Sequence, residues 1–525
     1  MKLILKDYIS TFKEEKELEK LLDNILIMND FKDIIRPQKG VTQHGVDFSA
    51  KKNDEIYLFV LKQKDIDKSN WDSGNNAVRP TLNEILDTYI PQRLRDSNNI
   101  INIVVCTNGI MKQNIEASWN GYIENHSTQR LRFDFWNIDD LVTYTEQYLL
   151  NEYIFEDELK SDLRKTLYFY EEDTNLKYYN ELLKKLINKI NLKNRKYEKN
   201  ILVYLLITKM CIKYAYDKNI KIAITMAERS LITYWKFLNI NNLFEKEDEI
   251  GYLNNICYEY ELCCKHYIEE IKKIYQFKPS FPIYNSVEYR LIVYEVIGII
   301  STYTYYTFYY NGKTKEVENN INLLIHLINN NASFFYPVYD SNSIEINILI
   351  FLLKETNNNQ IDILIEALMA KIFYRMSNSK YYPVEHENFD KVLDIEFNNE
   401  VNFCNASILL SNLLEWLIVE KKDELFKNAY DALIRKFPEI TFNSIEIDSN
   451  NEIEYFNSNT DDSIITYIIE FNQDLKNIID EMKQVYKSNK LENYKFYEYC
   501  ALPFLFIFSR NMRLPLPSNI IYQFI

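Results

Sequence analysis

Glycine and proline are scarce in this chain, which holds 8 glycines and 11 prolines in 525 residues. Collagen-like, propeller-like and loop-rich β architectures place turn residues at regular intervals, so this scarcity excludes them. Hydrophobic residues make up 47% of the chain and aromatic residues 15%, which excludes a largely disordered protein. The composition therefore predicts a folded and mainly helical protein.

The chain also lacks features of secreted and membrane proteins. Its seven cysteines are scattered and include no C-x-x-C pair, which argues against a disulfide framework or a structural zinc site. Asp7 interrupts the first residues before an apolar run of signal-peptide length. The longest uncharged stretch, 296–312, ends in Ser, Thr and Tyr and favours a buried helix over a membrane span. We expect a cytoplasmic protein that makes no membrane contact.

An excess of positive charge is missing as well, because the net charge is −15. Such a balance opposes nucleic-acid binding over the whole surface. Residues 1–150 carry 19 lysines and arginines against 23 acids, a net of −4, and the rest of the chain carries −11. Any nucleic acid should therefore contact a local groove in residues 1–150 and avoid the remainder.

The first 150 residues alternate between helical and strand periodicity. The spacing predicts the order helix–strand–strand–helix–strand–helix–strand–helix, and a further strand fits around 34–36. This order defines an α/β fold with a central mixed sheet flanked by helices. The expected helices cover 18–26, 80–89, 112–122 and 138–150, and the expected strands 46–50, 56–62, 100–106 and 131–136.

Beyond about residue 155 the pattern becomes helical. We divide the chain into an α/β domain at 1–152 and an all-helical region at 153–525, whose length has room for two subdomains. No fixed repeat period emerges, so an irregular array of paired helices is expected there, without any sheet of three or more strands. Such a region suits sensing, homo-oligomerisation or binding of a protein partner.

The most informative residues are Asp47, at the start of the first predicted hairpin strand, and Lys62, at the end of the second. Two antiparallel strands bring such positions to the same end of a sheet. A carboxylate there can hold Mg²⁺ or Mn²⁺, and an ammonium can stabilise charge that develops on a phosphate. We expect these two side chains to lie within metal-bridging reach of each other.

This arrangement resembles the PD-(D/E)XK, or restriction-endonuclease-like, superfamily, and is most similar to its Mrr-like branch. The resemblance covers about residues 10–150 and includes a helix glutamate, because Leu18-Glu19 followed by Leu21-Leu22 matches the family's Phe-Glu-x-hydrophobic-hydrophobic pattern. It implies that Asp47, Lys62 and Glu19 are catalytic and that Asp47 and Glu19 hold the metal. It also implies a DNA-cleaving effector of a bacterial restriction or antiphage defence system.

One position departs from the family pattern. Two residues before Lys62, where the family has Glu, Asp or Gln, this chain has Val60. A valine side chain cannot ligate a metal, so catalysis is expected only if other groups replace the acid. Two alternatives therefore stay open: an inactive nuclease-fold scaffold that binds nucleic acid or protein, and a helical adaptor.

Basic residues near the predicted site provide candidate phosphate contacts. Gln43 lies in the segment that leads to Asp47, and four cations follow the second hairpin strand or lie on the next helix. The candidate nucleic-acid contacts are Gln43, Lys64, Arg79, Arg93 and Arg95.

Overall fold

The chain forms two compact units, Met1–Ala215 and Tyr216–Ile525. The computed structural model describes residues 2–36, 44–73, 77–95, 99–148, 155, 157–172, 175–194, 197–277, 286–378, 382–385, 387–397, 405–447, 455, 464–488, 490–494 and 502–525.

The first unit contains a five-stranded mixed sheet in the strand order β1-β2-β3-β4-β5. The pairs β1/β2 and β2/β3 are antiparallel, and β3/β4 and β4/β5 are parallel. The predicted α/β class with a central mixed sheet is thereby confirmed. The strands are β1 (Lys32–Ile35), β2 (Phe48–Lys52), β3 (Glu55–Lys62), β4 (Ile101–Thr107) and β5 (Leu131–Trp136).

The turn between β2 and β3 is shorter than the five polar residues in the sequence suggest. Only Asn53 and Asp54 lie between the strands, and both have positive φ values, of 51° and 60°. This is the backbone that a two-residue hairpin turn requires. The β2/β3 pairing extends to Lys51, Lys52 and Glu55. Their backbone groups pair across the two strands although their side chains are polar.

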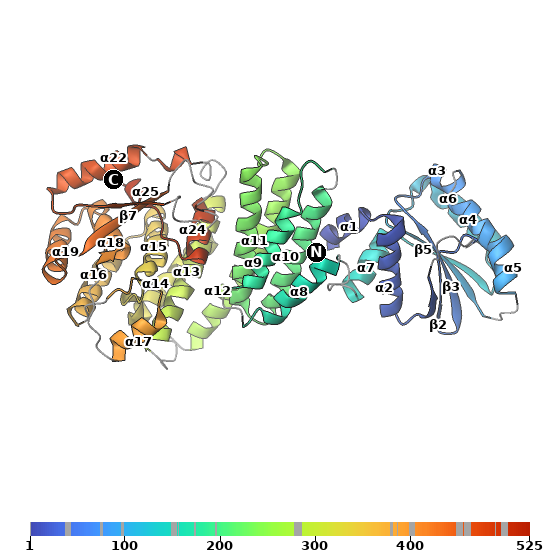
Figure 1. The fold of residues 1–525 in the computed structure, drawn as a ribbon, viewed down its shortest axis with the longest axis horizontal. Coiled ribbons are helices and arrows are strands. Elements are labelled where there is room, and N and C mark those ends of the chain that lie inside the picture. The colour runs from blue at the N-terminus through green and yellow to red at the C-terminus, as the bar shows by residue number, and fades with distance from the viewer. Residues whose placement is uncertain are drawn as a thin grey trace. The chain divides into compact units, whose positions relative to one another are not determined.

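Helices cover both faces of this sheet (Figure 1). On one face, α3 (Lys68–Asp72), α4 (Val78–Glu84) and α6 (Gln113–His126) bury a hydrophobic cluster with β3 and β4. A π-helical turn, η2 (Ile85–Tyr89), and α5 (Ile90–Arg93) continue α4. On the other side lie α1 (Lys2–Ser10), α2 (Glu19–Met28) and α7 (Ile138–Tyr148). Between α1 and α2, the chain forms a second π-helical segment, η1 (Glu14–Leu18).

Three helices complete the first unit. They are α8 (Asp157–Phe169), α9 (Lys177–Asn188) and α10 (Tyr197–Tyr216). Helices α8 and α9 pack on each other, and α10 is buried along most of its length. Leucines of α8 and α9 recur at three- and four-residue spacing, which gives each helix one apolar face.

The second unit is mostly helical, as predicted. Its central helices pack through apolar side chains, and α13 and α15 share one of the largest interfaces. The helices are α11 (Ile220–Ile240), α12 (Glu247–Phe277), α13 (Ser286–Asn311), α14 (Lys315–Asn330), α15 (Ser343–Glu355), α16 (Ile361–Asn378), α17 (Phe389–Phe397), α18 (Ile408–Val419), α19 (Asp423–Lys436), α22 (Leu475–Ser488), α24 (Leu502–Met512) and α25 (Asn519–Tyr522).

The expectation that this region contains no sheet of three strands is wrong. Strands β6 (Ala406–Ser407), β7 (Thr441–Ile447) and β8 (Ile464–Ile468) form one, with β6/β7 parallel and β7/β8 antiparallel. The stretch 463–487, which lies in the region predicted to be helical, divides into β8 and α22. Strands β7 and β8 are rich in Ile and Thr, whose β-branched side chains favour strands. The apolar residues of this region also fit a helical spacing, so the sequence pattern indicated a helix.

The uncharged stretch 296–312 lies mainly in α13, where Val296, Ile300 and Tyr303 are buried in the protein. This agrees with a buried helix. Across the part of the chain that the structure describes, no helix combines the length and the apolar character needed to cross a membrane.

Candidate active site at the end of β3

The loop before β2 holds Asp47 against β3. Gly45 has φ +82°, and a Cβ at this position would lie 2.8 Å from the carbonyl oxygen of Thr81 on α4, so the loop packs closely on that helix. The Asp47 N–H donates to the carbonyl of Phe59 at 2.9 Å, and its Oδ2 accepts from the Leu61 N–H at 2.7 Å. These bonds fix the carboxylate beside the residue that precedes Lys62.

Lys62 ends β3 and is buried, with 8% of its surface exposed. Its Nζ lies 3.5 Å from the Thr81 Oγ1. Burial lowers the pKa of Lys62, while the charges of Asp47 and Glu14 act to raise it. In turn, burial raises the pKa of Asp47, opposed by the Leu61 N–H and by the charge of Lys62. The structure thus brings Asp47 and Lys62 together at one end of the sheet.

Glu14 is a site residue that the sequence reasoning missed. It begins η1, the π-helical segment that contacts β3, and it acts on the Lys62 pKa. Glu19 lies one π-helical turn further, where its backbone N–H donates to the Glu14 carbonyl. Helical spacing from Leu18 onward points to Glu19, whereas the wider π turn that brings Glu14 to Lys62 has no clear sequence signal.

Val60 is fully buried in the hydrophobic cluster between the sheet and α4, together with Leu82 and Val105. The position where the family carries an acid therefore faces the core. Among the described residues, no group of three or more His, Cys, Asp or Glu side chains is arranged to hold a metal ion. Two carboxylates, those of Asp47 and Glu14, are the acids that act on Lys62.

The predicted nucleic-acid contacts do not all gather at this site. Lys64 is exposed just after β3, and exposed Arg79 begins α4, where it forms an ion pair with Asp72 at 3.1 Å. Arg93 ends α5 and stacks on Tyr89, and Arg95 follows it. Since α4, η2 and α5 form a continuous helix roughly 20 Å long, these two arginines lie at the opposite end of the sheet. Gln43 lies outside the described residues.

Asn108 serves the structure of this region. It follows β4, is 2% exposed, and its Nδ2 donates to the carbonyls of Ile9, Ser10 and Phe12. Its Oδ1 accepts from the Lys64 N–H at 2.8 Å. One buried side chain therefore ties the segment before η1 to the loop after β3.

Comparisons of the chain with protein-family models, with curated proteins and with solved structures found no match. The chemistry of the site therefore rests on its own residues.

Proposed function

We propose that the first unit is a metal-dependent nuclease that acts on DNA. The observation that carries this proposal is the burial of Lys62 at the end of β3, next to the residue that holds the Asp47 carboxylate, with the charges of Asp47 and Glu14 acting on its pKa. A buried lysine is costly unless nearby acids compensate its charge, and such clusters with perturbed pKa values gather at functional sites.

The topology around these residues supports the family resemblance. A helix, α2, precedes the sheet, Asp47 precedes the second strand, and Lys62 ends the strand paired with it. Strand β4 then adds to β3 in parallel, after the crossover through α4. This is the order that a restriction-endonuclease-like core requires, and we include that fold in the proposal.

The donor set fits a magnesium ion. Mg²⁺ in phosphate-processing sites keeps several waters and uses one or two protein carboxylates. Asp47 and Glu14 would hold it, and the family pattern adds Glu19 as a candidate ligand. When bound, the ion supplies positive charge at the scissile phosphate and acidifies a coordinated water.

The protein's own groups have distinct tasks in this mechanism. The bond from the Leu61 N–H fixes one oxygen of Asp47 and leaves the other for an incoming ligand. Lys62 presents a cation whose pKa burial lowers, which makes its proton easier to exchange with an attacking water. The Thr81 hydroxyl, 3.5 Å from Nζ, positions that ammonium.

The test is cleavage of plasmid DNA by the full chain with Mg²⁺ or Mn²⁺. We expect Asp47→Asn and Lys62→Met to reduce cleavage by about 100-fold or more, as losses of charged catalytic groups do. Asp33→Asn is the matched control, because Asp33 is an exposed acid of the same sheet, paired with Lys51. Cleavage that survives both site variants would rule out this assignment.

The burial of Val60 favours a second candidate, a nuclease fold that binds DNA without cutting it. This alternative predicts no cleavage with either metal, yet salt-sensitive DNA binding by residues of the first unit. The Lys64→Glu/Arg79→Glu variant should weaken that binding in both cases, because these two exposed cations lie near the end of β3. If charge reversal leaves binding unchanged, DNA does not approach this end of the sheet.

A further inference from the structure

The loop after β3 holds Lys64 in an unusual backbone conformation. Lys64 has φ +72°, in the left-handed region that residues with a Cβ rarely adopt. Its side chain is exposed, and among the described residues its ammonium forms no ion pair. The conformation therefore comes from the contacts of its backbone.

Three consecutive residues after β4, the 107–109 segment, make these backbone contacts. The Thr107 hydroxyl donates to the Lys64 carbonyl at 2.6 Å, and the Lys64 N–H donates to the Asn108 Oδ1 at 2.8 Å. Gly109 lies so close that a Cβ there would be 2.3 Å from the Lys64 carbonyl carbon, so only glycine fits. Thr107 and Asn108 are buried, so water does not compete for these bonds.

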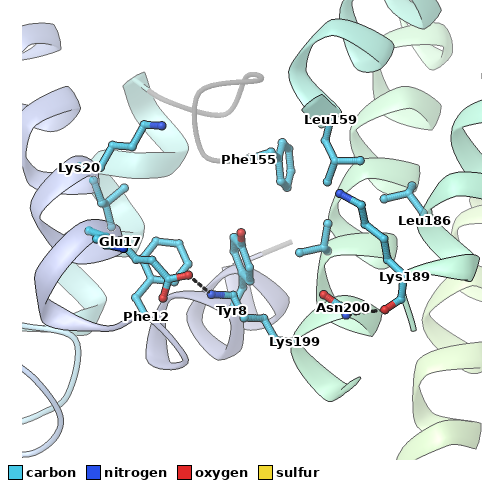
Figure 2. A pocket seen from close by; sticks show the side chains of 13 residues that line it. Tyr8, Phe12, Glu17, Lys20, Phe155, Leu159, Leu186, Lys189, Lys199 and Asn200 are labelled. Atoms are coloured by element: carbon cyan, nitrogen blue, oxygen red, sulfur yellow. Dashed lines mark hydrogen bonds and ion pairs between the residues drawn. The ribbon is translucent and has the colours of Figure 1, made fainter. Parts of the chain in front are cut away.

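The 107–109 segment is in turn held by the N-terminal part of the chain. The Asn108 Nδ2 donates to the Phe12 carbonyl at 2.9 Å, and the Gln63 side chain donates to the same carbonyl at 3.0 Å. Figure 2 shows Phe12 beside Lys199 of α10, whose Nζ lies 5.1 Å from the centre of the Phe12 ring. The backbone of Lys64 is therefore fixed by groups from distant parts of the first unit.

The acids that follow Lys64 in the chain are already engaged. Asp65 forms an ion pair with Lys112 at 2.7 Å, and Asp67 accepts hydrogen bonds from two backbone N–H groups at the start of α3. Within the described residues, the Lys64 charge is thus left without an ion-pair partner, two residues after Lys62 and at the same end of the sheet.

Strained conformations persist only where the surrounding structure imposes them, and they cluster at functional sites. A lysine ammonium binds phosphate as a point charge, and a lysine whose backbone is already fixed loses less entropy on binding. We infer that Lys64 contacts a phosphate of the DNA at the end of β3, and that Thr107, Asn108 and Gly109 are positioning residues that act through Lys64. This inference rests on the proposed function.

The test is the salt dependence with which the full chain binds duplex DNA in EDTA, so that cleavage does not interfere. Loss of one phosphate contact makes the slope of log K against log salt shallower by about 1, and it weakens binding about eightfold at roughly 0.1 M salt. We expect both changes for Lys64→Asn, because asparagine tolerates a positive φ but carries no charge. Lys64→Arg should keep the wild-type slope. Lys421→Asn is the matched control, since Lys421 is an exposed lysine with φ +57° in the second unit.

The positioning role is tested by combining variants. Gly109→Ala places a methyl group against the Lys64 backbone and should also make the slope shallower by about 1. The double variant Lys64→Asn/Gly109→Ala should lose about 1 and not 2, because both changes act on the same phosphate contact. Thermal unfolding checks that the variants fold, and Thr107→Val, which keeps the side-chain shape, takes the place of a Gly109→Ala that does not.

The outcomes separate this inference from the nuclease assignment. If Lys64→Asn leaves the affinity and the slope unchanged, or if Lys421→Asn changes them equally, the inference is wrong and the nuclease assignment still stands. Additive losses in the double variant would overturn the positioning role of the 107–109 segment. A Lys64 effect on binding, together with cleavage that survives Asp47→Asn and Lys62→Met, would overturn the nuclease assignment alone. A full chain that binds no DNA would overturn both.

Discussion

Replacing Asn108 by alanine should destabilise the first unit by about 2–3 kcal/mol. The change removes hydrogen bonds to the carbonyls of Ile9 and Phe12, at 3.1 and 2.9 Å, and the bond from the Lys64 N–H, at 2.8 Å. The Phe12 carbonyl still accepts a hydrogen bond from the Gln63 side chain, so losing the bond from Asn108 costs little at this carbonyl. A buried hydrogen bond contributes about 1 kcal/mol, and a donor left unsatisfied costs about 1–3 kcal/mol, so the Lys64 N–H dominates the sum.

Hydrogen exchange of the full chain measures this effect, because peptides from β3 and β4 report the first unit separately from the second. Asn108→Asp keeps the acceptor for Lys64 but turns a carboxylate toward backbone carbonyls, so it should destabilise more than alanine does. Asn70→Ala is the control, since Asn70 is an exposed asparagine that also donates to a backbone carbonyl, that of Asp65. A loss below about 1 kcal/mol for Asn108→Ala, or an Asp variant as stable as the wild type, would refute this reasoning.

Two further predictions concern pH. DNA cleavage should rise with pH as Asp47 loses its proton, at a pKa that burial raises above 3.8. Cleavage should fall again at higher pH as Lys62 loses its proton, at a pKa that burial lowers below 10.5. In the Lys62→Arg variant any remaining activity should lack this alkaline fall, because arginine stays charged. In the second unit, burial raises the pKa of Asp340 to about 6 from 3.8, so its contribution to stability is present below about pH 4 and is lost as pH rises to about 6. Between pH 4 and 7, the free energy of unfolding in urea should change less for Asp340→Asn than for the wild type, by about 3 kcal/mol at most. An equal change in both proteins would contradict a raised Asp340 pKa.

The sheet of the first unit was predictable because its strands are local and strongly patterned. Apart from Asn102, the run 101–106 consists of β-branched and apolar residues, and the structure buries every one of these positions in β4. The segment at Asp47 and the strand ending at Lys62 are separated by a short turn, so their convergence follows from hairpin geometry alone. The site residues that come from one hairpin were therefore accessible from sequence.

The residues that depend on packing between distant segments were not accessible. Asn108 and the loop after β3 meet the segment at Ile9 and Phe12, which lies almost a hundred residues earlier in the chain. Strands β7 and β8 are short, and neither shows enough alternation in sequence to be distinguished from part of a helix. Arg93 and Arg95 seemed close to Lys62 along the chain, yet a helix of several turns carries them away from it.

The position of Glu14 explains how Lys62 can be buried although Val60 provides no acid. A lysine ammonium that leaves water loses hydration free energy, and nearby carboxylates must offset that loss. Asp47 does so from the loop before β2, and Glu14 does so from η1, whereas a carboxylate at position 60 would enter the hydrophobic cluster with Leu82. Asp47 and Glu14 offset only part of this cost, since the pKa of Lys62 remains lowered, and one of the two acids comes from a π-helical segment instead of from β3. Any process that moves η1 must therefore change the electrostatic environment of Lys62.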